Sequence, residues 1–128
     1  MKRGDNMRFD KFTMKAQEAI QESQGIAEKY GHQQIDPEHL LMDLTLQKDG
    51  IVTPILKKLE VDPAIVLSRL EELLTKIPKV SGGGMDQVYL SPRSKKVFDQ
   101  SFQEAERLKD EYVSTEHIFI AIADAKGG

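Results

Sequence analysis

Apolar residues recur every three or four positions along most of the chain, which is the pattern of helices that bury one face. The first stripe predicts a helix from about Met14 to Tyr30, with Thr13 as its N-cap and Gly31 as its left-handed stop. Its buried positions are expected at Ala16, Ala19, Ile20, Ser23, Ala27 and Tyr30. Further stripes predict five more helices, which start near residues 37, 51, 63, 92 and 115.

Several of these helix starts carry a capping residue followed by proline. Proline fits the first helical turn because its missing N–H would have no partner there, and an Asp or Ser before it accepts from an unpaired backbone N–H. This signature occurs at Asp36-Pro37, Asp62-Pro63 and Ser91-Pro92. Lys, Glu, Gln, Leu and Ala dominate the composition, and these residues favour helices. The predicted fold class is therefore all-α.

The segment DPEHLLMDL, residues 36–44, returns as STEHIFIAI at residues 114–122. The offset of 78 positions holds without a gap from Phe12 and Leu90 to Leu44 and Ile122, and it makes Ser114 the expected cap of the last helix. Self-similarity at a fixed period indicates a duplicated structural unit. The sequence therefore predicts one helical domain built from two tandem pseudo-symmetric repeats. The second repeat is expected to be truncated, because it lacks counterparts of the helices over residues 51–77.

The predicted division is a flexible N-terminal arm over residues 1–12, a first repeat over 13–78, a glycine-rich linker over 79–89 and an incomplete second repeat over 90–128. The arm is charged and lacks periodicity, and the linker carries three consecutive glycines, which lose much backbone entropy when ordered. A phosphate-binding loop would continue with Lys and Ser or Thr, whereas Met85 and Asp86 follow the glycines here. Nucleotide binding by this segment is therefore not expected.

Composition narrows the classes of partner. The chain of 128 residues has the size of one domain, and its 30% of charged residues are mixed in sign, with a net charge of -3. This balance offers no basic surface for nucleic acid and no polybasic patch for a membrane. The chain has no cysteine, and its first residues are polar without an apolar signal segment. We therefore expect a cytoplasmic protein.

The repeated Glu-His pair is the clearest candidate for chemistry. His39 and His117 each stand in the first turn of a predicted helix, where the helix dipole disfavours imidazolium, so a neutral capping or packing histidine is the favoured interpretation. A metal-assisted hydrolase that uses both histidines and nearby Glu is the alternative. The sequence shows neither an HExxH spacing nor a nucleophile elbow, so no catalytic, cofactor-binding or metal-binding residue is assigned.

Four segments in order carry a resemblance to a known family: MRFDKFTMKAQEAI, GHQQIDPEHLLMDLTLQKDG, LTKIPKVSGGG and YVSTEHIFIAI. They resemble the N-terminal domain of ClpB-type AAA+ disaggregase chaperones, which is built from two Clp repeats, and the resemblance runs from Met7 to the last residue. It implies a domain tethered to hexameric ATPase rings that use ATP and Mg²⁺, and a role in binding exposed apolar segments of unfolded or aggregated polypeptides. By itself this domain is expected to be monomeric and to lack ATPase activity.

The resemblance also implies which residues bind the client. The family's motifs place the polar contacts on Thr13, Asp110 and Glu116 and a shallow apolar groove on Val97, Phe98, Leu108 and Ile118. We expect Phe98 and Ile118 to supply exposed apolar surface, and the three polar residues to tolerate mutation with little loss of stability. The related protease-associated unfoldases share the repeat and use this domain to dock adaptor proteins, which is the alternative function.

Overall fold

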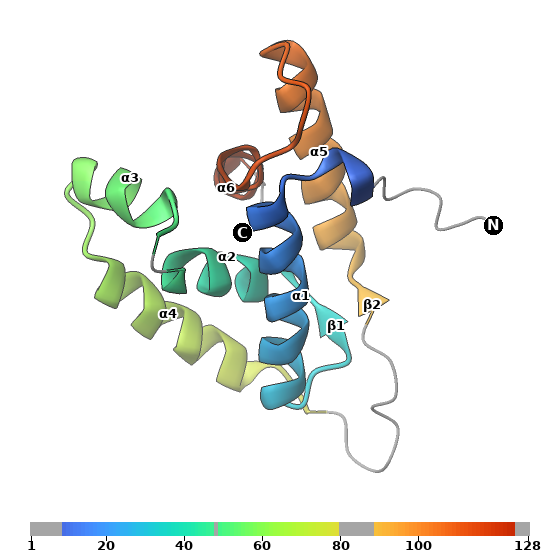
Figure 1. The fold of residues 1–128 in the computed structure, drawn as a ribbon. Coiled ribbons are helices and arrows are strands. Elements are labelled where there is room, and N and C mark those ends of the chain that lie inside the picture. Colours follow the sequence, from blue (N-terminus) through green and yellow to red (C-terminus); the bar gives the residue numbers. More distant parts are fainter. Residues whose placement is uncertain (1–8, 48, 80–88, 125–128) are drawn as a thin grey trace.

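The computed structural model describes residues 9–47, 49–79 and 89–124, and its helices follow the predicted order (Figure 1). The described elements are η1 (Phe9–Lys11), α1 (Met14–Lys29), β1 (Gln34–Ile35), α2 (Pro37–Leu46), α3 (Val52–Lys58), α4 (Pro63–Lys76), β2 (Tyr89–Leu90), α5 (Pro92–Arg107) and α6 (Thr115–Asp124). The all-α prediction is confirmed, because the two strands comprise only two residues each. None of the described helices combines the length and the hydrophobicity needed to cross a membrane.

Three helix starts are capped by the side chain that the sequence predicts. The Thr13 hydroxyl accepts from the Ala16 N–H at 3.2 Å, and the Ser91 hydroxyl accepts from the Ser94 N–H at 3.1 Å. The Asp62 carboxylate accepts from a backbone N–H of α4 at 2.9 Å. Each bond satisfies one of the backbone donors that a helix leaves unpaired in its first turn. The expected left-handed stop of α1 is also present, since Gly31 has a φ of 77°.

Two short parallel pairings join the repeats in a pseudo-symmetric way. Ile35 of β1 pairs with Leu90 of β2, and an isolated parallel bridge joins Phe12 to Val113. Phe12 and Leu90 are equivalent positions of the two repeats, as are Ile35 and Val113. The start of each repeat therefore pairs with the connector between the two helices of the other repeat. The sequence pattern did not predict these strands, because two-residue strands carry no detectable alternation.

The predicted flexible arm is shorter than residues 1–12. Residues 9–11 form the 3₁₀ turn η1, and Phe12 is a buried core residue whose ring meets Phe98 edge to face at 5.6 Å between centroids. The prediction was wrong for residues 9–12 because the apolar Phe12 side chain anchors this stretch, while residues 1–8 lie outside the described residues. Residues 80–88 of the predicted linker also lie outside them, and Tyr89 belongs to β2.

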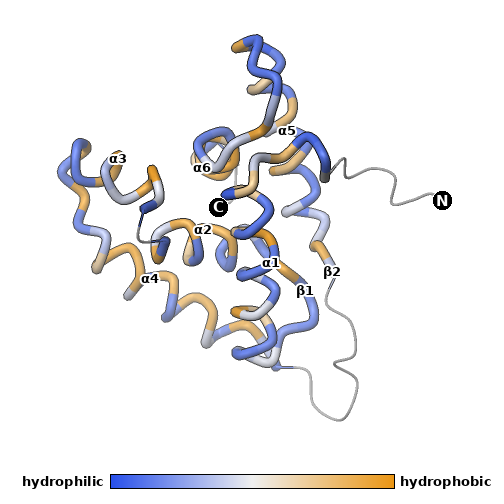
Figure 2. Tube along the Cα trace, viewed as in Figure 1, coloured by the Kyte–Doolittle hydropathy of each residue, from blue (hydrophilic) through white to orange (hydrophobic). Residues whose placement is uncertain are grey.

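Helices α1 and α2 pack against each other in the first repeat, as α5 and α6 do in the second, and α2 also contacts α4 and α6. The main core contains Leu40, Leu44, Phe98 and Ile118. Under α4 a smaller cluster is formed by Met42, Leu70 and Leu74. Figure 2 shows hydrophobic positions recurring along α4, which agrees with a helix that buries one face on its neighbour.

Candidate functional site

The apolar residues expected to form the groove do not share one environment. Phe98 is only 1% exposed, and Val97 and Ile118 are buried with it in the core between α5 and α6. Leu108, at the C-cap of α5, is 47% exposed. The expectation that Phe98 and Ile118 present surface to a client is therefore wrong, because their stripes face the partner helix. Leu108 is the member of this set that a client could reach directly.

Thr13 has a structural role at the junction of the repeats. Besides capping α1, it donates its backbone N–H to the Val113 carbonyl at 2.9 Å, and the Val113 N–H donates to the Lys11 carbonyl at 2.7 Å. These bonds hold the start of α1 against the loop that precedes α6. Thr13 is therefore adjacent to that loop, while its hydroxyl is already engaged in the cap.

Asp110 and Ser114 flank a buried histidine. The His117 Nδ1 accepts from the Ser114 backbone N–H at 2.9 Å, and the His117 Nε2 lies 3.0 Å from Asp110 Oδ2. Because Nδ1 acts as an acceptor, the neutral ring carries its proton on Nε2, which donates to the Asp110 carboxylate. The buried imidazole thus spans from the cap of α6 to a carboxylate that is 52% exposed at the surface.

The first repeat contains the same arrangement with one substitution. The His39 Nδ1 accepts from the Asp36 backbone N–H at 2.8 Å, and the His39 Nε2 lies 2.9 Å from the Nδ1 of His32. His32 and Asp110 are equivalent positions, seven residues before the repeated histidine. Burial, and next the neighbouring His32, lower the pKa of His39, so its ring is neutral near pH 7. The capping role favoured from the sequence is confirmed for both histidines.

Asp110, His117 and Ser114 also have the composition of a catalytic triad, since the Ser114 hydroxyl lies 3.0 Å from the His117 Nδ1. The single lone pair of Nδ1 already accepts from the Ser114 backbone N–H. This competition leaves the hydroxyl without a dedicated base, so the arrangement acts as a helix cap rather than as an activated nucleophile. Sequence reasoning missed that these residues meet, although the spacing repeated in His32 and His39 was a visible signal.

The alternative of a metal site at His39 and His117 gains no support from this geometry. Both nitrogens of each ring are within hydrogen-bond distance of the groups named above, which leaves no free imidazole lone pair for a metal. Across residues 9–47, 49–79 and 89–124, no group of three or more His, Cys, Asp or Glu is placed to hold a metal ion.

A hollow of about 370 Å³ lies beside the loop that contains Asp110, and we call it the loop hollow. It is lined by Lys11, Phe102, Ala105, Glu106, Asp110, Glu111 and Val113. Half-buried Phe102 contacts Phe12 at 5.3 Å between ring centroids, and so ties the hollow to the core. Leu108 and Tyr112, both about half exposed, alternate with the lining residues along the loop. Glu116 is exposed in the first turn of α6 and does not line the hollow.

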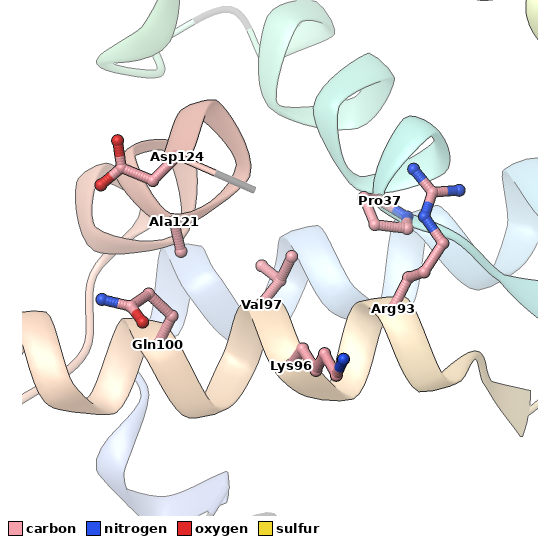
Figure 3. A pocket seen from close by; sticks show the side chains of 7 residues that line it. All are labelled: Pro37, Arg93, Lys96, Val97, Gln100, Ala121 and Asp124. Carbon is pink, nitrogen blue, oxygen red and sulfur yellow. The ribbon is translucent and has the colours of Figure 1, made fainter. Parts of the chain in front are cut away.

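A second hollow, of about 290 Å³, lies between α5, α6 and the start of α2, and we call it the interhelix hollow. Its lining residues are Pro37, Arg93, Lys96, Val97, Gln100, Ala121 and Asp124. Figure 3 shows Val97 and Ala121 facing each other across it, with Arg93 beside Pro37. The Arg93 guanidinium is bidentate to the Glu38 carboxylate at 3.0 and 3.2 Å, which fixes one rim. Of the four predicted groove residues, Val97 lines this hollow and the other three do not. Asp110 lines the loop hollow instead, and none of the four groove residues is among the lining residues there.

The pattern of the Clp repeat (R) N-terminal domain family matches residues 11–128. The chain is 44% identical over 116 residues to the chaperone protein ClpB of Bdellovibrio bacteriovorus, and 42% identical to that of Rhodopirellula baltica. Both alignments cover 91% of this chain, which spans only 13% of the length of each relative.

Solved structures show the same fold at lower identity. The Hsp104 N-terminal domain of Candida albicans has a TM-score of 0.80 and 21% identity, and the alignment covers 88% of this chain and 73% of that one. The N-terminal domain of the ClpV1 ATPase of E. coli has a TM-score of 0.80 and 18% identity, covering 90% and 69%. A ClpV N-domain in complex with a VipB peptide has a TM-score of 0.77 and 16% identity, covering 88% and 67%.

Proposed function

We propose, given that the chain belongs to the Clp repeat (R) N-terminal domain family, that it is the substrate-binding N-terminal domain of a ClpB-type chaperone. Its clients are exposed apolar segments of unfolded or aggregated polypeptides. The observation that carries this proposal is the loop hollow, whose lining includes three carboxylates beside the junction of the two repeats, while the same loop carries the exposed side chains of Leu108 and Tyr112.

The chemistry of the loop hollow suits an extended chain. The half-buried ring of Phe102 gives the hollow an apolar wall, and Leu108 and Tyr112 offer exposed apolar surface on the loop that contains Asp110. The carboxylates of Glu106 and Asp110 are acceptors for the backbone N–H groups of a client. A small, open hollow gives few desolvated contacts, and a disordered client loses conformational freedom on binding. The affinity is therefore expected to be micromolar or weaker.

The proposal extends to the whole protein. This chain spans 13% of the length of its ClpB relatives. In the whole protein, we propose, the remaining part supplies the AAA+ ring and binds ATP and Mg²⁺. Six such subunits would assemble in the cytoplasm. In that setting this domain delivers the client and does no ATP hydrolysis itself. Turnover of ATP by the isolated domain above background would contradict this division of labour.

The test compares two exposed leucines on different surfaces. Reduced, carboxymethylated ribonuclease is titrated into ¹⁵N-labelled protein, and shifts are followed for wild type, Leu108→Ser and Leu73→Ser. Leu73 on α4 is 49% exposed, against 47% for Leu108, so the two substitutions remove similar surface. Leu108→Ser is expected to weaken binding and Leu73→Ser to leave it unchanged. Equal binding by Leu108→Ser and wild type, with both folded, would place the client site elsewhere.

Docking of an adaptor is the second candidate function. A structural relative binds a VipB peptide, and the interhelix hollow of this chain is lined by apolar Val97 and Ala121 together with Arg93, Lys96 and Asp124. The Lys96 side chain is exposed and lines this hollow, so Lys96→Ala should weaken the binding of an adaptor there. Leu108→Ser should leave that binding unchanged. The opposite ranking of the two variants would assign the bound partner to the loop hollow.

A further inference from the structure

A third hollow, of about 280 Å³, lies away from both sites between the outer face of α1 and the C-terminal end of α2. We call it the acidic hollow, and its lining residues are Lys15, Glu18, Glu22, Asp43, Leu46, Gln47 and Asp49. Four of these seven side chains are carboxylic acids and one is a lysine, whereas the loop hollow has three acids and one lysine and the interhelix hollow has one acid and two cationic residues. Its composition therefore favours a ligand with positive charge.

Two acceptor atoms in the acidic hollow are buried without a partner. Asp43 is only 5% exposed, and neither its Oδ2 nor the Oε1 of Gln47 has a hydrogen-bond partner among the described residues. The amide nitrogen of Gln47 is directed to the Lys15 carbonyl at 3.5 Å, which leaves the amide oxygen as the free end of this side chain. A buried acceptor without a donor costs free energy, so an N–H or O–H donor from outside the described residues would stabilise both atoms.

The charge around Asp43 strengthens this requirement. Burial is the first cause that raises the pKa of Asp43, to about 7, and a hydrogen bond to Glu22 and the charges of Glu22 and Glu18 add to it. Ionisation of this cluster is therefore opposed by the protein alone and favoured by a bound cation. Lys15 is the cationic residue in the lining, and among the described residues no ion pair joins it to these carboxylates.

We propose that the acidic hollow binds the guanidinium group of an arginine presented by a polypeptide that the domain holds. Guanidinium carries five N–H donors and no acceptor, so it complements a site made of Asp43 Oδ2, Gln47 Oε1 and neighbouring carboxylates. Leu46 lines the same hollow and is 54% exposed, which provides an apolar contact for the methylene stem of arginine. The inference rests on the proposed function in taking a polypeptide as the partner.

The first experiment uses N-acetyl-arginine methylamide as the probe, with the citrulline analogue as its neutral isostere. Both are titrated into the ¹⁵N-labelled domain at pH 8, and the amide shifts of residues 15–22 and 43–49 are followed. The arginine probe is expected to shift these amides saturably, and the citrulline probe to do so at least about tenfold more weakly, since a charged hydrogen bond is lost. The lysine analogue is expected to bind more weakly than arginine, because it offers three donors rather than five.

Variants test the named atoms. Asp43→Asn keeps the size of the side chain and removes its charge, so binding of the arginine probe should weaken about tenfold or more. Glu28→Gln, on α1 but outside the hollow, is the matched control and should bind as wild type. Because the carboxyl cluster must ionise to hold the cation, affinity for the probe should fall as the pH is lowered through about 7.

Several results would overturn the proposal. These are equal binding of arginine and citrulline probes, unchanged binding by Asp43→Asn, or tighter response of the same amides to CaCl₂ than to arginine, which would indicate a metal site. Binding seen only in Lys15→Gln would show that Lys15 itself occupies the hollow. Failure of the arginine probe while unfolded ribonuclease still binds at Leu108 would remove this site and leave the proposed function standing.

Discussion

Replacement of Asp110 by Ala should destabilise the fold, although the side chain is exposed. The perturbation removes the acceptor of the buried His117 Nε2–H, which lies 3.0 Å from Asp110 Oδ2, and His117 in turn accepts from the Ser114 N–H at the start of α6. A buried donor left without a partner costs about 1–3 kcal/mol, and access of water at a half-exposed carboxylate favours the lower end. We expect a loss of about 1–2 kcal/mol.

Urea denaturation followed by circular dichroism at 222 nm measures this loss. With a slope of about 2 kcal/mol per molar urea, in the middle of the range for a small domain, a loss of this size lowers the midpoint by roughly 0.5–1 M. Asp110→Asn retains an oxygen acceptor and should lose less than Asp110→Ala. Glu111→Ala is the matched control, since Glu111 is the exposed neighbour that lines the same hollow and has no bond to a histidine in the described structure.

An Asp110→Ala midpoint equal to that of Glu111→Ala would refute the reasoning, because it would show that the bond to His117 adds nothing to stability. The predicted outcome also changes how the client site must be studied. A triple Ala variant at positions 13, 110 and 116 would remove the cap of α1 and the partner of His117 together with any client contact. The sequence analysis expected these residues to tolerate mutation with little loss of stability, whereas their bonds lead us to expect that Thr13 and Asp110 variants lose stability as well.

Four further outcomes are expected. Phe98→Ser should destabilise by more than 3 kcal/mol in urea denaturation, because Phe98 is 1% exposed in the core. Gly31→Ala should cost about 1 kcal/mol in the same assay, because φ is 77° there. Because the pKa of His39 is lowered in the folded state, the unfolded chain binds a proton more readily. The free energy of unfolding should therefore be highest above about pH 6.5 and fall at lower pH. A flatter pH profile for His39→Gln than for wild type, in the same assay, would support this origin. Asp43, whose folded pKa is raised to about 7, contributes in the opposite direction, so Asp43→Asn should raise the urea midpoint more at pH 8 than at pH 5.

Helix positions were predictable because their signals are local. A cap residue, a proline in the first turn and an apolar stripe lie within a few residues of one another, as at Asp62 and Pro63, where α4 begins as predicted. The repeat was predictable for the same reason, since the offset between His39 and His117 is read directly from the chain. The family resemblance, carried by segments that hold these signals, is confirmed.

Pairings between distant segments could not be predicted in this way. The bridge from Phe12 to Val113 joins residues with no shared local pattern, and it is what converts the end of the expected arm into core. Burial on α5 was misjudged because a stripe shows which residues share a face without showing what covers it. Phe98 lies within α5 and is buried in the core, whereas Leu108, ten positions later at the C-cap of that helix, is about half exposed.

The two repeats use one cap for different surfaces. In each repeat the histidine Nδ1 holds the start of the second helix, and Nε2 reaches the residue seven positions earlier. That residue is the buried His32 in the first repeat and the exposed Asp110 in the second. In the second repeat a carboxylate takes the place of the imidazole, so the surface gains the acceptor oxygens of Asp110, which its bond with His117 holds in place. The histidine cap itself is the same in both repeats. Duplication therefore supplies the same histidine cap twice, and a change at one position of one copy adds a carboxylate to the lining of the loop hollow.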